Sequence, residues 1–94
     1  MYKVVLKVQE PFEYKGETSS RIVIKCNLEF PKRKNAIAYI ERELHTRGFK
    51  DISRDYHRGF KESICSAWTG ESWFNEGNGI VEKEIYNYIL TKIC

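Results

Sequence analysis

Two stretches in which apolar and polar side chains alternate most constrain the fold of this chain. In residues 2–9, every second side chain from Tyr2 to Val8 is apolar, and residues 21–30 repeat the pattern. A period of two is typical of a strand that turns one face toward a core. On residues 21–30, this face is predicted to carry Ile22, Ile24, Cys26, Leu28 and Phe30. The polar connection at 10–20 contains Pro and Gly, so the two stretches predict an antiparallel hairpin with a long loop.

A helical pattern follows the hairpin. Pro31 ends the preceding strand because it has no backbone N–H to donate. Over residues 34–47, apolar side chains recur at three- and four-residue spacing, at Ile37, Ile40 and Leu44. Gly48 stands where a left-handed residue commonly ends a helix, and Asn35 is a candidate N-cap. We therefore predict a helix over residues 34–47.

The second half of the chain gives a weaker pattern. Residues 51–57 and 60–69 are predicted as two strands, although apolar residues of the second stretch also fit one helical face. Residues 80–94 place apolar side chains at helical spacing and predict a second helix, with an edge strand as the alternative because of their Ile and Tyr content. The resulting order, ββα-ββ-α, predicts an α+β two-layer sandwich: an antiparallel sheet of about four strands with two helices.

Length and composition predict one folded domain over residues 1–94. A compact chain of this length has a radius of gyration of about 12 Å. The 41% of hydrophobic residues argues against disorder. No apolar run approaches the roughly 20 residues that cross a bilayer, and Lys3 interrupts the apolar N-terminus, unlike a signal peptide. Three widely spaced cysteines do not resemble a disulfide framework, so we expect a reducing, cytoplasmic compartment.

Charge is distributed unevenly along the chain. Residues 1–61 carry 14 Lys and Arg against 8 Asp and Glu, whereas residues 62–94 carry 2 against 5. Positive charge is densest over residues 32–61, where aromatic residues alternate with it. Such a stretch favours an anionic partner, either a nucleic acid or an acidic protein face. The sequence pI of about 8.8 is only mildly basic, which argues against tight sequence-independent DNA binding.

Three groups of residues are candidates for partner binding. The first, Lys32, Arg33 and Lys34, crowds positive charge at a helix start, where the helix dipole disfavours it. The second lies in the basic-aromatic stretch 49–61, where cations suit phosphates and rings suit unpaired bases; it comprises Arg54, Tyr56, Arg58 and Lys61. The third is Trp73 and Phe74, two large rings in a polar, Gly-rich loop. The alternatives are chance surface charge for the first group, a solvated sheet face with Tyr56 and Phe60 in the core or half-buried beside it for the second, and a loop anchor for the third.

Motifs for chemistry are weak in this sequence. Cys65 follows His57 by eight residues, but no closely spaced ligand pairs of the kind that bind zinc are present. Cys26 and Cys65 fall on predicted strands, where free cysteines commonly pack as small apolar side chains. Residues 77–79 read Gly-Asn-Gly, without the Lys-Ser/Thr of a phosphate-binding loop. We therefore expect no catalytic residue, cofactor or metal.

These observations favour a non-enzymatic binding protein that acts by occupying a macromolecular partner. A protein partner is expected, with a nucleic-acid-binding complex as one candidate, and membrane binding is not expected. Proteins of this length without catalytic motifs include small inhibitors of nucleic-acid-handling enzymes, such as phage anti-defence proteins. Only the length and the missing motifs indicate that this chain belongs to that class. Direct RNA or DNA binding through residues 49–61 is the alternative. The sequence leaves the oligomeric state open.

Overall fold

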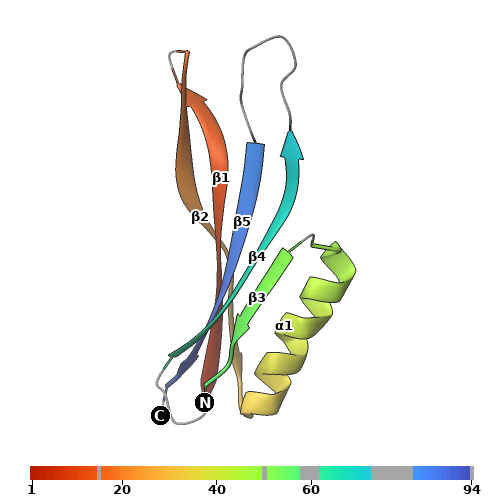
Figure 1. The fold of residues 1–94 in the computed structure, drawn as a ribbon. Helices are drawn as coiled ribbons and strands as arrows, with labels where there is room; N and C mark the ends of the chain where they lie inside the picture. The colour runs from red at the N-terminus through yellow and green to blue at the C-terminus, as the bar shows by residue number, and fades with distance from the viewer. Residues whose placement is uncertain (15, 50, 58–61, 73–81, 94) are drawn as a thin grey trace.

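A computed structural model describes the chain except for residues 15, 50, 58–61, 73–81 and 94. Its elements in chain order are β1 (Tyr2–Tyr14), β2 (Glu17–Phe30), α1 (Arg33–Arg47), β3 (Asp51–Asp55), β4 (Glu62–Ser72) and β5 (Glu82–Lys92). The strands form one sheet of five in the order β2-β1-β5-β4-β3, and every neighbouring pair is antiparallel. α1 lies along one side of this sheet (Figure 1). The predicted α+β class with an antiparallel sheet is confirmed.

The predicted second helix is wrong, because β5 is a strand in the middle of the sheet. Tyr88 and Leu90 of β5 are buried on the side of α1, whereas Ile85 and Ile89 alternate with them and face the other way. In a central strand with large apolar side chains on both faces, apolar residues can also recur every three or four positions, as they do in a helix. Its Ile and Tyr residues favour an extended backbone, and pairing on both sides satisfies that backbone. The described residues thus form five strands and one helix, instead of four and two.

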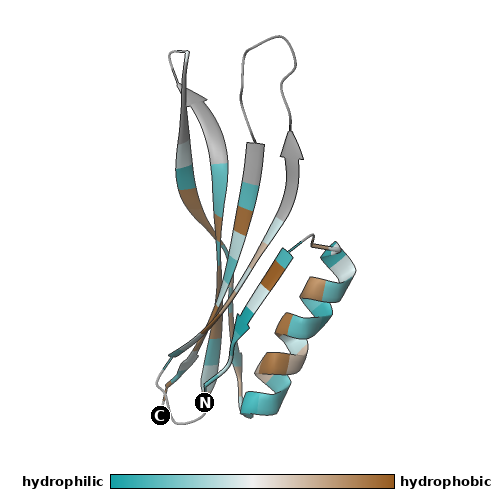
Figure 2. Ribbon diagram, viewed as in Figure 1, coloured by the Kyte–Doolittle hydropathy of each residue, from teal (hydrophilic) through white to brown (hydrophobic). Residues whose placement is uncertain are grey.

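The core lies between α1 and the sheet. Its fully buried side chains include Leu6 of β1, Ile40 and Leu44 of α1, and Tyr88 of β5. Figure 2 shows hydrophobic and hydrophilic residues alternating in bands along α1 and the strands. The predicted helix is confirmed to within one residue. It ends at Gly48, which has φ 63° and donates its N–H to the Leu44 carbonyl at 3.2 Å.

The predicted loop over residues 10–20 is largely strand. β1 and β2 stay paired up to Tyr14 and Glu17, and Gly16, with φ 78°, lies in the tight turn between them. The hairpin therefore extends well past the end of α1 (Figure 1). As a result the molecule measures 51 × 25 × 20 Å and its radius of gyration is 15.6 Å, larger than the compact value expected from length.

The predicted apolar face of β2 needs correction. The register between β1 and β2 shifts between Leu6 and Lys7, so the five apolar side chains expected on one face of β2 divide between its two faces. β3 and β4 confirm the two strands predicted in the second half of the chain. Trp68 of β4 pairs with Ile85 on the face away from α1. Across the described parts of the chain, no helix has the length and hydropathy needed to cross a bilayer.

Candidate partner-binding site at the α1–β3 seam

α1 and β3 lie side by side at one edge of the molecule (Figure 1). α1 packs mainly against β1, β2 and β5 rather than against β3. Polar contacts connect α1 to β3 and the residues just after it, including one between Glu41 and Arg54 and one between Arg33 and His57. We call the region where the inner side of α1, between Lys32 and Phe49, meets the segment from Ile52 to His57 the α1–β3 seam; the exposed Arg42 of α1 does not line it.

Three successive cations mark one end of the seam: Lys32, Arg33 and Lys34, here called the basic end. Lys32 is the N-cap residue in place of the predicted Asn35, and no side chain caps the helix. The first turn of α1 contains no acidic residue. Lys32 and Lys34 are exposed, and neither forms an ion pair with any residue that the structure describes. Their charges therefore add to the positive end of the helix dipole.

The His57 carbonyl ties three elements together beside the basic end. It accepts a hydrogen bond from Arg33 Nη2 at 3.4 Å and another from the Ser63 hydroxyl at 3.4 Å. The His57 imidazole Nε2 in turn contacts the Asp55 carboxylate. The start of α1, the end of β3 and the start of β4 thus converge, although they are far apart in the sequence.

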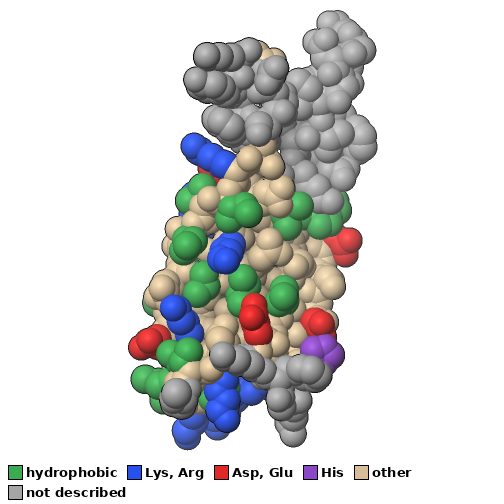
Figure 3. Space-filling view, turned by 90° about the vertical axis from the view of Figure 1, so that its left-hand side faces the viewer, with side chains coloured by type: hydrophobic (Ala, Val, Ile, Leu, Met, Phe, Trp, Pro, Cys, Tyr) green, Lys and Arg blue, Asp and Glu red, His purple; other side chains and the backbone are tan. Residues whose placement is uncertain are grey.

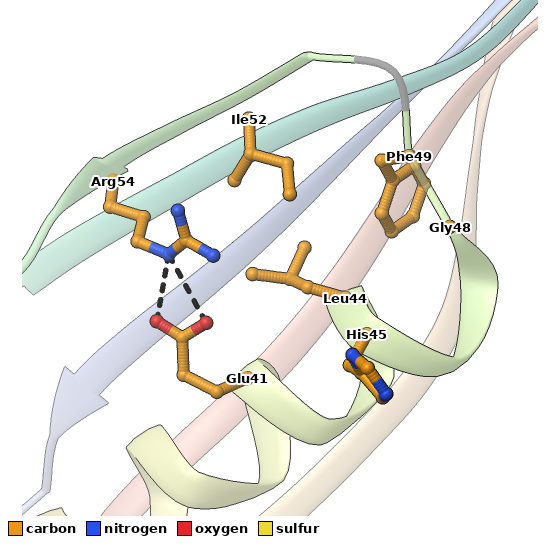
Figure 4. A pocket seen from close by; sticks show the side chains of 7 residues that line it. All are labelled: Glu41, Leu44, His45, Gly48, Phe49, Ile52 and Arg54. Carbon is orange, nitrogen blue, oxygen red and sulfur yellow. Dashed lines mark hydrogen bonds and ion pairs between the residues drawn. The ribbon is translucent and has the colours of Figure 1, made fainter.

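Arg54, a predicted binding residue, is already paired within the chain. Its Nε donates to both carboxylate oxygens of Glu41, at 2.7 Å and 3.1 Å (Figure 4). This hydrogen bond to Glu41 is the main reason that the pKa of the Arg54 guanidinium is raised. The charge of Arg54 is therefore balanced locally and does not add to that of the basic end.

A hollow of about 420 Å³ opens in the seam between α1 and β3. Its lining consists of Glu41, Leu44, His45, Gly48, Phe49, Ile52 and Arg54 (Figure 4). The Arg54–Glu41 ion pair lies at one end of the hollow and Phe49 at the other (Figure 4). The aliphatic side chains of Leu44 and Ile52 lie between them. The Phe49 ring is fixed by an edge-on contact with Tyr86, with ring centroids 5.0 Å apart. Sequence reasoning missed this hollow; the only local signal was that apolar residues continue just after the end of the helix.

Tyr56 and Cys65 belong to the packed interior beside the seam. The Tyr56 hydroxyl is buried. This burial is the main reason that the pKa of Tyr56 is raised, and the neighbouring Cys65 thiol raises it further. Cys65 is fully buried, and burial raises the pKa of its thiol. The prediction that Cys65 packs as an apolar side chain is confirmed. Tyr56 follows its alternative interpretation as a half-buried residue packed against the core.

The remaining predicted binding residues, Arg58, Lys61, Trp73 and Phe74, lie outside the described residues and stay predictions. Within the described ranges, no group of three or more His, Cys, Asp or Glu side chains is arranged to hold a metal ion. No protein-family model, curated protein or solved structure matches the chain. The function is therefore argued from the seam itself.

Proposed function

We propose that the protein is a non-enzymatic binding protein that occupies an acidic, partly apolar segment of a protein partner at the α1–β3 seam. The observation that carries this proposal is the basic end, with its three successive cations and no acidic residue in the first turn of α1. Like charges at this end of a helix are unfavourable in the free protein. Acidic side chains of a partner would relieve that accumulation.

The hollow supports the same type of partner. Leu44 and Ile52 offer an apolar floor, and the Arg54–Glu41 pair offers a polar rim. An apolar anchor within a polar surround is typical of protein–protein interfaces. A segment that follows the seam would thus place its acidic residues at the basic end and an apolar side chain in the hollow.

Direct RNA or DNA binding remains the competing class. Within the stretch 49–61, Arg54 is paired with Glu41 and the Tyr56 hydroxyl is buried, so less of the stretch is available to phosphates and bases. We therefore favour a protein partner. Inhibition of a nucleic-acid-handling enzyme, of the phage anti-defence kind, is compatible with this activity and rests only on chain length and the missing motifs.

The test compares two charge-reversed variants that have the same net charge. Lys32→Glu/Lys34→Glu alters the basic end, and Lys25→Glu/Arg42→Glu alters exposed cations elsewhere. Each isotopically labelled protein is titrated with a glutamate-rich peptide that contains one leucine, and separately with a single-stranded oligonucleotide. The NMR shifts of backbone amides report both affinity and location.

We expect the peptide to shift amides at the basic end and around the hollow in the wild type and in the control variant, and not in Lys32→Glu/Lys34→Glu. Binding should weaken as salt rises, because the contacts are exposed ion pairs. If the oligonucleotide binds at the seam and the peptide does not, the direct nucleic-acid class replaces this proposal. Peptide shifts that are equal in both charge-reversed variants would overturn the role of the basic end.

A further inference from the structure

The face of the sheet away from α1 carries apolar side chains that no described element covers. Figure 3 looks onto this side, where hydrophobic side chains are spread over the sheet with charged side chains among them. Ile22, Ile24 and Ile64 are 68%, 62% and 44% exposed, values that are high for residues so apolar. Val5 and Ile89 also lie on this face and are half-buried. This apolar surface is a candidate interaction site.

Charge on this face is divided about the central strand. Lys3 and Lys7 of β1 lie on one side of β5, and Glu29 of the neighbouring β2 pairs with Lys3. Asp51 of β3 and Glu62 of β4 lie on the other side. The sheet order puts β1 and β4 at equal distances from β5, one on each flank. On this face β1 therefore carries cations and β3 and β4 carry carboxylates, on opposite flanks of β5.

Residue register makes β1 and β4 complementary to each other. Lys3 and Glu62 both pair with Thr91, so they stand at the same level of the sheet. Val5 and Ile64 both pair with Ile89, two residues further along. When two such faces meet about a two-fold axis parallel to β5, β1 of one copy lies over β4 of the other. Lys3 then faces Glu62 of the second copy, and Val5 faces its Ile64.

We propose that the protein forms a homodimer in which these two sheet faces pack against each other. The contact is isologous, so each pair occurs twice. A two-fold axis perpendicular to the strands would instead place β1 on β1, with Lys3 and Lys7 facing cations. Facing sheets are rotated by about 30° through their twist, an offset that long Lys and Glu side chains can span.

The size of the patch sets the expected strength of the dimer. Lys3 to Gln9 covers about 20 Å along the strand, and five strands cover about 19 Å across the sheet. This is a small patch beside the roughly 800 Å² that each partner buries in an interface of standard size. We therefore expect a dissociation constant in the micromolar range. The seam lies on the other side of the sheet, so this dimer does not depend on the proposed function.

The test uses sedimentation velocity and light scattering on the whole chain. We expect the wild type to pass from monomer to dimer as its concentration rises. Lys3→Glu places Glu against Glu twice, and Glu62→Lys places Lys against Lys twice, so each variant should raise the dissociation constant by about tenfold or more. In a mixture of the two variants, a dimer with one copy of each again sets opposite charges against each other at both contacts. Mixing should therefore restore dimers.

Two further variants separate this contact from other effects. Ile64→Asn should also weaken the dimer while circular dichroism shows a folded protein, because Ile64 is 44% exposed and lies outside the buried core. Arg42→Glu, on the exposed side of α1, should dimerise like the wild type. A wild type that stays monomeric throughout, or two single variants that stay monomeric when mixed, would overturn the proposal. Dimerisation of Lys3→Glu alone at the wild-type concentration would do the same.

Discussion

Ile24 and Cys26 are two residues apart on β2, yet their side chains point to opposite faces of the sheet. Cys26 pairs with Leu6 and lies toward α1, where its Sγ is 3.4 Å from the Tyr39 hydroxyl. Ile24 pairs with Lys7 and is 62% exposed on the other face. The ladder has one more residue on β2 than on β1 at this point, which makes Lys25 the bulged residue. The bulge thus places isoleucines on the face proposed to dimerise.

Deletion of Lys25 should therefore be tolerated. Without Lys25, Ile24 and Cys26 become adjacent and alternate in a regular ladder, each on the face it already occupies. We expect a change of about 1 kcal/mol or less in the free energy of unfolding, measured with urea, as for changes at surface positions.

Deletion of Asn27 is the matched control. If the ladder closes up over this gap, Lys25 moves opposite Leu6 into the partly buried position of Cys26 beside Tyr39. The lysine displaces the packed thiol, and its charge is partly desolvated there, so we expect a larger destabilisation, about 2 kcal/mol. Equal losses in the two deletions would contradict the assignment of the bulge to Lys25.

The phenol of Tyr88 predicts a stabilising substitution. Tyr88 is 0% exposed, and no described group lies within hydrogen-bond distance of its buried hydroxyl. A buried hydroxyl without a partner costs about 1–3 kcal/mol. Tyr88→Phe should therefore raise the free energy of unfolding by about 1 kcal/mol, as measured by chemical denaturation.

Tyr39→Phe is the matched control for that change. The Tyr39 hydroxyl donates to Glu43 Oε1 at 3.0 Å and lies 3.4 Å from Cys26 Sγ. Removing it should lower stability by about 1 kcal/mol, the usual net contribution of a hydrogen bond. A loss of stability in Tyr88→Phe would mean that its hydroxyl has a partner.

The contrast between β1 and β5 shows how far the sequence could predict the fold. β1 buries one face, so its alternation identifies a strand directly. β5 lies between two strands and has apolar side chains on both faces, which removes the alternation that marks a strand. Only tertiary pairing with β1 and β4 distinguishes it from a helix. The bulge at Lys25 is equally invisible, because one extra residue leaves the local pattern unchanged.

The sequence could predict only the part of the candidate site that consists of neighbouring residues in the chain. The basic end is three consecutive residues, so the sequence displays it. The pairing of Arg54 with Glu41 joins positions 13 residues apart through the packing of α1. That pairing removes Arg54 from the predicted basic surface, and it also forms one end of the hollow. Spacing along the chain contains no signal for such a contact.

The end of α1 gives a prediction about backbone strain. Gly48 adopts φ 63°, a left-handed conformation that side chains rarely adopt, and an added Cβ would meet no atom within 4 Å. The cost of Gly48→Ala is therefore conformational only, about 1 kcal/mol. Gly48→Asn should cost less, because Asn tolerates this region better. Thermal or urea unfolding that ranks alanine as stable as glycine would contradict the left-handed assignment.

Alkaline pH should destabilise the protein, through its tyrosines. Burial raises the pKa of Tyr88 to about 12, whereas an unfolded tyrosine titrates near its ordinary value of 10.0. Burial also raises the pKa of Tyr86 and of the Cys65 thiol. Below about pH 10, Tyr88 is protonated in both states and its contribution to stability is complete.

Between about pH 10 and 12, the unfolded chain releases the Tyr88 proton and the folded chain keeps it, so stability falls by up to about 1.4 kcal/mol per pH unit for this group. Urea unfolding at a series of pH values from about 9 to 11.5 should show this decline, and Tyr88→Phe should show a shallower one. Ultraviolet absorbance of the phenolate should show that the phenols of the folded protein ionise at a higher pH than free tyrosine does. This ionisation should occur in the same pH range as unfolding. Equal slopes in the two proteins would mean that Tyr88 ionises in the folded state as readily as in the unfolded chain.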